Sequence, residues 1–305
     1  MTSTAKVLDV FICTTQNFRV GTFVTIASLI EHLSPAQETT IHLLSQSFSE
    51  DSLKYIEELI RDSGKPIRLE YKVIDLSVFS EIHEKQNGNY IRLFSEGIYG
   101  RLLIPTLFPK VKFGIYLDSD FLIQRDLSEL AKLSESPTPL FAVTDHTVKT
   151  VSHQGDSIDC EKFNLNPNAP YFNSGFLVMN LQHWDREDLI PNCTRISRET
   201  NVQFPDQSLL NIIFTNKWES IDSKWNHMRL PEDWDFAFAK NNANYHFLGP
   251  LKPWIWPSRY AIGCIRKIHY YINKIPKEII DDYSPIRKPY PLFFAKHHLR
   301  KLIGK

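Results

Sequence analysis

Apolar and polar positions along the first 120 residues alternate between two patterns. Short apolar runs rich in β-branched and aromatic residues predict buried strands, and longer stretches with apolar residues three or four positions apart predict helices. The predicted strands span Leu8–Thr14, Thr39–Leu44, Ile67–Ile74 and Phe113–Leu117. The predicted helices span Val20–Leu33, Ser49–Ile60 and Ile91–Leu107, with Ser49 or alternatively Ser52 as the N-cap of the second.

This alternation predicts an α/β fold, with a mostly parallel central sheet flanked by helices on both faces. The second half of the chain is less regular. It contains predicted strands at Leu140–Val143 and Phe176–Leu181 and a predicted helix at Asp206–Phe214, directly after Pro205. From Pro250 onward prolines are frequent and periodicity fades, so we interpret this part as an appended C-terminal segment.

Composition excludes several classes of protein. The chain has 305 residues and a formal net charge of zero, so the molecule as a whole has no electrostatic bias toward nucleic acid. Its four cysteines form no C-x-x-C pair, which argues against a zinc site or a disulfide framework and favours reduced thiols in the cytoplasm. No run approaches the roughly 18 apolar residues of a membrane span. We expect a soluble protein, or at most one bound to a membrane surface.

The first candidate for chemistry is Asp118-Ser119-Asp120, which follows a predicted buried strand. In an extended strand, residues i and i+2 point the same way, so the two carboxylates could grip one hard cation such as Mn²⁺ or Mg²⁺. Such a cation would stabilise a departing diphosphate. The alternative is a surface turn without function. In a parallel sheet, however, ligands bind beyond the carboxyl ends of strands, where these residues are expected.

A second group offers a third metal ligand and phosphate-binding groups. Neutral His246 can bind a metal, Gly249 permits close approach of the backbone to a phosphate, and Lys252 supplies a positive charge. Arg101, inside a predicted helix, could bind phosphate or a sugar hydroxyl. The alternatives are a surface loop with a hydrogen-bonded histidine and a solvated helix arginine.

A third group could bind a sugar. Asn173 and Ser174, before a predicted strand, could bond hydroxyls, and Gly175 would admit the sugar closely. Asp206 could accept bonds from the sugar, while Gln207 presents a carboxamide to the reacting carbon. The alternatives are an ordinary turn for the first three residues and a helix N-cap for Asp206.

Together these motifs resemble glycosyltransferase family 8, which includes glycogenin and bacterial lipooligosaccharide galactosyltransferases. The resemblance covers roughly residues 8–256. It rests on Tyr99-Gly100-Arg101, Tyr116-Leu117-Asp118-Ser119-Asp120, Asn173-Ser174-Gly175, Asp206-Gln207 and His246 through Trp254, in this order. It implies a GT-A fold, retention of anomeric configuration, a UDP-sugar donor (UDP-galactose or UDP-glucose), and Mn²⁺ (or Mg²⁺) held by Asp118, Asp120 and His246.

The resemblance also implies roles for individual residues. Donor binding falls on Thr14, Gln16, Asn17, Arg101, Asp118, Ser119, Asp120, Asn173, Ser174, Gly175, Gly249 and Lys252. Catalytic roles fall on Gln207, Asp206 and Asp145. One departure concerns the first strand, which in the family ends in paired aspartates that help to read uracil and ribose. Thr15 and Gln16 stand there instead, although Gln16 can still hydrogen-bond a base edge.

The segment Arg287–Lys305 combines six cationic side chains with aromatic ones and contains no acidic residue. This composition suits an anionic membrane surface, and the alternative is a solvated tail that packs against the body of the protein. We therefore expect a catalytic domain at residues 1–256, a C-terminal segment at 257–305, and a cytoplasmic enzyme that binds the inner face of the membrane.

The resulting hypothesis is a retaining hexosyltransferase that acts on lipopolysaccharide, lipooligosaccharide or another glycan. One alternative is a catalytically silent sugar-nucleotide-binding protein, which Thr15 and Gln16 would suit. Another is a phosphatase of the haloacid dehalogenase type, but that motif needs threonine where Leu122 stands. No G-x-G-x-x-G, P-loop or G-x-S-x-G motif is present.

Overall fold

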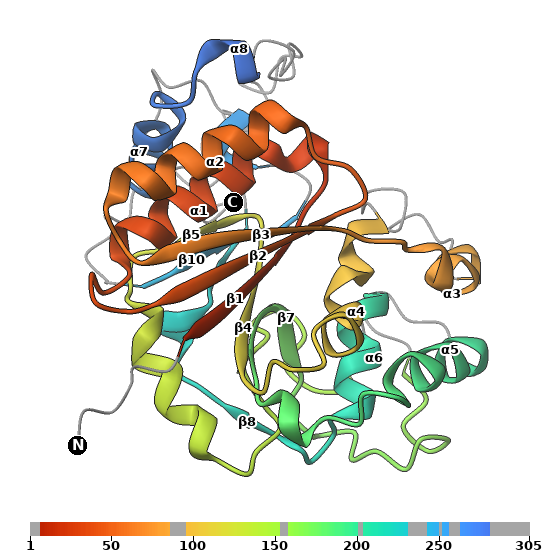
Figure 1. Ribbon diagram of the computed structural model, residues 1–305. Helices are drawn as coiled ribbons and strands as arrows, with labels where there is room; N and C mark the ends of the chain where they lie inside the picture. Colours follow the sequence, from red (N-terminus) through yellow and green to blue (C-terminus); the bar gives the residue numbers. More distant parts are fainter. Residues whose placement is uncertain are drawn as a thin grey trace, which may run out of the picture.

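The computed structural model describes residues 7–85, 96–152, 158–200, 204–230, 243–249, 252–255 and 263–280. At its centre is a seven-stranded sheet with the order β3-β2-β1-β4-β7-β6-β8 (Figure 1). Its strands are β1 (Leu8–Cys13), β2 (Thr39–Ser45), β3 (Ile67–Val73), β4 (Gly114–Asp118), β6 (Leu140–Thr144), β7 (Phe172–Met179) and β8 (Trp218–Ser220). Only β7 runs antiparallel to its neighbours in this sheet, so the predicted mostly parallel α/β architecture is confirmed.

Helices cover both faces of the sheet (Figure 1). Helices α1 (Arg19–His32) and α2 (Glu50–Ser63) lie on one face; α4 (Gly100–Leu107), α5 (Leu189–Glu199) and α6 (Pro205–Ile213) lie on the other. Strand β1 shows how the sequence produces two cores. Val10 and Ile12 pack with α1 and α2, whereas Phe11 and Cys13, on the opposite side of the strand, pack with α4 to α6.

Most elements of the first half match their predicted positions within a few residues. Ser49 is the N-cap of α2, and its side chain accepts a hydrogen bond from the main-chain N–H of Ser52. The predicted helix at 91–107 is described from residue 96, where a 3-10 turn (Glu96–Tyr99) leads into α4. Residues 91–95 lie outside the described part of the chain.

A second, three-stranded sheet has the order β5-β10-β9. It contains β5 (Phe121–Leu122), β9 (His227–Arg229) and β10 (Tyr245–Phe247). The remaining elements are α3 (Ser80–Lys85) and short 3-10 segments at Gln16–Phe18, Ser77–Phe79, Leu127–Glu135, Leu181–His183, Ser223–Trp225 and Pro253–Ile255. Because the strands of this sheet are only two or three residues long, periodicity could not reveal them.

The C-terminal region is more regular than the sequence suggested. Residues after 256 include α7 (Gly263–Ile272) and α8 (Lys277–Ile280), which were not predicted. Ile265, Ile268 and Tyr271 of α7 are buried in the same core as α1. The division at residue 256 stays a prediction, and the basic and aromatic residues of 287–305 lie outside the described residues.

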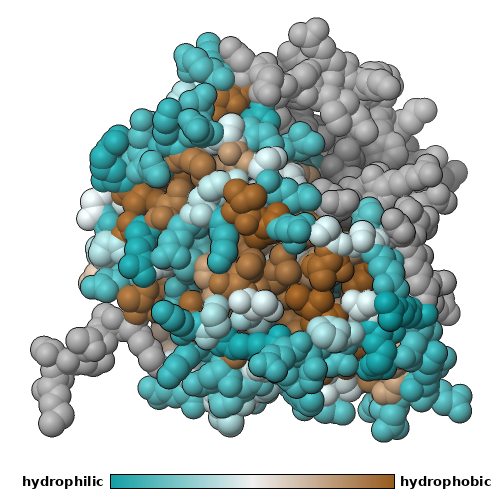
Figure 2. Space-filling view, turned by 45° about the vertical axis from the view of Figure 1, so that its right-hand side comes forward, coloured by the Kyte–Doolittle hydropathy of each residue, from teal (hydrophilic) through white to brown (hydrophobic). Residues whose placement is uncertain are grey.

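The surface view shows apolar side chains that reach the surface over the middle of one face, with polar ones around them (Figure 2). Of the large apolar side chains in the described part, Val7, Val73, Val78 and Tyr270 are exposed. Single exposed apolar residues are common on soluble proteins, so these four indicate no particular partner. None of the described helices is long and apolar enough to cross a bilayer.

We predict that Gly21→Ala destabilises the protein by about 1–3 kcal/mol through overpacking. A Cβ at Gly21 would lie 2.5 Å from the main-chain oxygen of Ser119 and 2.6 Å from the Trp254 ring, so α1 would have to move away from the turn after β4. Urea denaturation measures the change. Helix propensity alone would instead stabilise the variant, so a gain in stability would contradict this packing. Gly64→Ala is the control for backbone strain alone, because nothing lies within 4 Å and φ is +63°.

Candidate active site

A cavity of about 500 Å³ lies where β1 and β4 end. The first residues of the antiparallel β7 are at the same edge, since Phe176 pairs with Leu117. Most of the residues that the sequence singled out line this cavity: Thr14, Arg101, Asp118, Ser119, Asp120, Asp145, Asn173, Ser174, Gly175, Asp206, Gln207, His246, Gly249 and Lys252. The cavity therefore brings together side chains that are more than 200 residues apart in the sequence.

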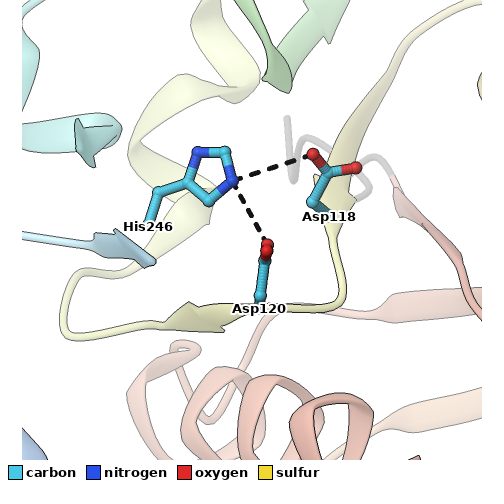
Figure 3. A group of neighbouring side chains, drawn as sticks. All are labelled: Asp118, Asp120 and His246. Carbon is cyan, nitrogen blue, oxygen red and sulfur yellow. Dashed lines mark ion pairs between the residues drawn. The ribbon is translucent and has the colours of Figure 1, made fainter. Parts of the chain in front are cut away.

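Asp118, Asp120 and His246 converge on one point (Figure 3). Asp118 is the last residue of β4, but Asp120 lies in the turn that follows, so the expectation of two carboxylates along one extended strand was wrong. The turn aims both carboxylates at the same place. His246 arrives on β10, where it pairs with Phe121 and stacks on its ring at 4.4 Å.

These three side chains fit a divalent cation. Nε2 of His246 lies 3.2 Å from Oδ1 of Asp120 and 3.7 Å from Oδ2 of Asp118 (Figure 3). Oδ1 of Asp120 is buried and accepts no hydrogen bond in the described part of the chain. Oδ1 of Asp118 accepts from the Tyr116 hydroxyl and from Arg101, which leaves its Oδ2 toward His246. Two carboxylate oxygens and an imidazole nitrogen suit Mn²⁺ or Mg²⁺.

Gly175 keeps this point open. A Cβ at this position would lie 2.2 Å from Cε1 of His246 and 2.7 Å from Oδ2 of Asp118. No side chain larger than hydrogen fits there without displacing a candidate ligand. The family resemblance implies a place for Gly175 beside the sugar, and its position beside His246 and Asp118 adds a second reason for glycine.

Arg101 is buried and not a solvated helix residue. Its guanidinium donates to Oδ1 of Asp118 at 2.7 Å and to the Ser174 hydroxyl at 2.8 Å, and Nε lies 3.2 Å from Oδ2 of Asp206. Burial alone would lower the pKa of Arg101, but the two carboxylates hold it above its ordinary value. Burial also raises the pKa of Asp118, which Arg101 opposes.

Lys252 is the second buried cationic residue that lines the cavity. Its ammonium donates to Oδ2 of Asp120 and to the main-chain oxygen of Phe247, each at 2.6 Å. Burial by itself would raise the pKa of Asp120, but Lys252 and His246 hold it well below its usual range. Asp120 is therefore ionised and available to a cation through its other oxygen.

The residues Asn173, Ser174 and Gly175 lie inside β7, so the prediction that they precede the strand was wrong, and so was the alternative of an ordinary turn. Asp206 is the second residue of α6, with Phe204 at the N-cap, so the capping alternative for Asp206 was also wrong. The Ser174 hydroxyl donates to Oδ2 of Asp206 at 3.0 Å. This bond connects the two segments beside Arg101.

Asp145 and Gln207 form a tight polar cluster. Oδ1 of Asp145 accepts from the main-chain N–H groups of Thr147 and Val148 and from the Thr147 hydroxyl. Oδ2 accepts from the side-chain amides of Asn173 and Gln207 at 3.0 and 3.2 Å. Burial would raise the pKa of Asp145, but these hydrogen bonds lower it.

The end of β1 has a different arrangement from the expected base-reading site. Thr14 and Thr15 line the cavity, whereas Gln16 and Asn17 do not. The Gln16 carboxamide accepts from the main-chain N–H of Ser49 at 2.9 Å and donates to the Ser49 hydroxyl at 3.2 Å. In this structure Gln16 therefore connects β1 to the start of α2.

Two residues of the site were missed by sequence reasoning. Tyr116 was quoted only as part of a motif, but its hydroxyl donates to Asp118 at 2.6 Å. Asn226, between the 3-10 segment Ser223–Trp225 and β9, lies 3.0 Å from Nδ1 of His246. Nothing in the local sequence around Asn226 marks it, because its partners are distant in the chain.

Residues 9–256 match glycosyl transferase family 8. The chain is 25% identical to the lipopolysaccharide glucosyltransferase WaaO of Escherichia coli K12, over 84% of this chain and 75% of that protein. It is 24% identical to the lipopolysaccharide 1,3-galactosyltransferase of Salmonella typhimurium, over 78% and 70%. General stress protein A of Bacillus subtilis is 23% identical, over 82% and 88%.

Solved structures show the same fold. The galactosyltransferase LgtC, in complex with donor and acceptor sugar analogs, superposes with a TM-score of 0.67 at 23% identity, over 89% of this chain and 98% of that one. The bifunctional glycosyltransferase WbbM gives 0.71 at 22% identity over 92% of this chain, which spans about half (52%) of WbbM. The family match overturns the phosphatase alternative. The chain belongs to glycosyl transferase family 8 and is a glycosyltransferase with the GT-A fold.

Proposed function

We propose that this enzyme transfers a hexose, galactose or glucose, from a UDP-sugar to a lipopolysaccharide or lipooligosaccharide acceptor, with retention of configuration. The observation that carries the proposal is the convergence of Asp118, Asp120 and His246 at the wall of one cavity. The names of the lipopolysaccharide glucosyl- and galactosyltransferase relatives support the choice of donor sugar and acceptor.

The donor diphosphate would lie at the three candidate ligands. Mn²⁺ (or Mg²⁺), when bound there, neutralises the diphosphate and stabilises it as a leaving group. Lys252 adds a buried positive charge beside Asp120, and Gly249, with φ +80°, presents its backbone to the cavity without a side chain. Ser119, in the turn between the aspartates, lines the same wall.

The hexose would lie against the polar wall formed by Arg101, Asp145, Asn173, Ser174, Asp206 and Gln207. Arg101 and Asp206 would hold hydroxyl groups by charge-assisted hydrogen bonds. Such a wall excludes water from one side of the sugar while it satisfies the hydroxyls, which is what a transferase needs to avoid hydrolysis.

The bonding of the carboxylates favours front-face attack by the acceptor. Both oxygens of Asp145 accept hydrogen bonds, and the ion pair between Oδ2 of Asp206 and Arg101 draws charge away from the Asp206 carboxylate, so each is a weakened nucleophile. Gln207 is an amide and a poor nucleophile. In the proposed step the bond from C1 to the diphosphate breaks, the acceptor oxygen bonds C1 from the same face, and its proton passes to the departing phosphate oxygen. Gln207 supports the cationic carbon.

The nucleoside is assigned to the end of β1. Thr14 lines the cavity there and, with Gln16 and Asn17, is our candidate for contacts to uridine. Gln16 would have to release Ser49 to read a base edge. We further propose a cytoplasmic location, with residues 287–305 bound to the anionic inner face of the membrane, where a lipid-linked acceptor is presented.

The experiment that tests the function is release of UDP from a panel of UDP-sugars without acceptor, with Mn²⁺ or with EDTA. We expect slow hydrolysis of one UDP-sugar that EDTA abolishes, and Asp118→Ala should reduce the rate to the EDTA level. Full activity of that variant would remove the metal assignment. If none of the UDP-sugars in the panel is hydrolysed, the result would favour a catalytically silent relative. The anomeric configuration of the product, measured by NMR with acceptor present, tests retention.

A second prediction concerns Gly175→Ala. The added methyl group would displace His246 or Asp118, so we expect affinity for Mn²⁺ to fall roughly 10- to 100-fold, as it does when metal ligands lose their orientation. Titration followed by electron paramagnetic resonance of free Mn²⁺ measures this. Gly64→Ala, on the surface after α2, serves as the control that should keep full affinity. Unchanged affinity in Gly175→Ala would show that the ion binds elsewhere.

A further inference from the structure

Asn226 connects the candidate metal ligand to the sugar-binding wall. Its side chain is buried (1% exposed) and bonds two side chains far from it in the sequence. Its Oδ1 lies 3.0 Å from Nδ1 of His246, and its Nδ2 lies 2.9 Å from Oδ1 of Asn173. Asn173 extends this series of hydrogen bonds, because its Nδ2 donates to Oε1 of Gln207 at 3.1 Å. Three amides thus connect His246 to the expected reacting centre.

The direction of these bonds is fixed by two groups that can play only one role. The main-chain N–H of Gly175 can only donate, and it lies 3.0 Å from Oδ1 of Asn173. The ionised carboxylate of Asp145 can only accept, and it lies 3.0 Å from Nδ2 of Asn173. Together they set the orientation of the Asn173 amide. Asn226 must then turn its NH₂ group to Asn173, and this leaves its oxygen for His246.

An amide oxygen beside Nδ1 requires a proton on Nδ1, because two acceptors would repel. In a neutral imidazole the other nitrogen, Nε2, then carries the lone pair. Nε2 is the atom that faces Asp118 and Asp120, whereas the second ring nitrogen points away from them (Figure 3). The opposite tautomer would need Asn226 and Asn173 to flip, and the flipped Asn173 would turn its NH₂ toward the Gly175 N–H and its oxygen toward Asp145.

We propose that Asn226 is a positioning residue that holds His246 in the tautomer able to bind a metal, and that Gly175 and Asp145 fix this choice through Asn173. The proposal rests on the proposed function, because it gives His246 the role of a metal ligand. Asn226 itself touches neither metal nor substrate. It acts through the ring that it orients, as groups behind metal-binding histidines commonly do.

Binding of Mn²⁺ alone, followed by electron paramagnetic resonance, tests the proposal in four proteins. Asn226→Leu removes the acceptor and should weaken binding roughly 10- to 100-fold. Asn226→Asp keeps an oxygen for Nδ1–H but places a second acceptor against Asn173, so it should bind more weakly than wild type and more tightly than Asn226→Leu. Asn180→Leu removes a buried asparagine outside the cavity and should leave affinity unchanged. A merely structural role would instead make the aspartate variant as weak as the leucine variant.

Wild-type affinity in Asn226→Leu, or equal weakness of the leucine and aspartate variants, would overturn the proposal. A second measurement does not depend on metal or on the stability of a variant. Long-range ¹H–¹⁵N spectra of metal-free wild-type protein, at a pH of about 8, report the tautomer of each neutral histidine. His246, assigned with His246→Asn, should carry a proton on Nδ1, where it faces the oxygen of Asn226, and an Nδ1 without a proton overturns the proposal. If wild-type protein binds no Mn²⁺ although Nδ1 of His246 carries a proton, the result contradicts the proposed metal site. It does not contradict the role of Asn226 in orienting His246.

Discussion

Compensation of buried charge is the constraint on which the arrangement of this site depends. Among the described residues that line the cavity, four are aspartates and two, Arg101 and Lys252, are basic. Asp145 accepts hydrogen bonds from neutral donors alone. Arg101 forms ion pairs with Asp118 and Asp206, and Lys252 forms one with Asp120. Three carboxylates therefore share two cations. A diphosphate would add further negative charge beside Asp118 and Asp120, and a divalent cation is the simplest way to hold all of these groups at one point.

The topology explains how such distant segments meet. The parallel part of the sheet ends with β1 and β4 at the cavity, and β7 begins there because it runs in the opposite direction. The small sheet then adds His246, since β10 pairs with β5 directly after Asp120. Gly21 lets α1 approach the turn between β4 and β5 closely. Packing of α1 against this turn therefore helps to position Asp120, which follows Ser119.

Sequence reasoning predicted the helices and strands that are long enough for apolar residues to recur at a regular spacing. It also predicted most residues of the cavity wall, from motifs that occur in the order typical of the family. It failed where structure depends on long-range contacts. Arg101 lies on a helix, and only the carboxylates brought by β4 and α6 make its burial possible. Helix α7 was missed because prolines flank it on both sides, although Ile265, Ile268 and Tyr271 recur at helical spacing and are buried in the same core as α1. Asn226 could not be found, since its role exists only when β7 and β10 stand beside it.

The direction of the hydrogen bonds fixes which end of each side-chain amide faces which neighbour, and distances alone do not show this. A side-chain amide offers a donor at one end and an acceptor at the other, so a chain of amides transmits a choice made at one end to the other. Here the choice is made by a main-chain N–H in β7 and by a carboxylate saturated with donors after β6. The same Asn173 amide that conveys this choice toward His246 also bonds Gln207. The orientations of His246 and Gln207 are therefore linked, because both depend on the direction of the Asn173 amide, directly for Gln207 and through Asn226 for His246.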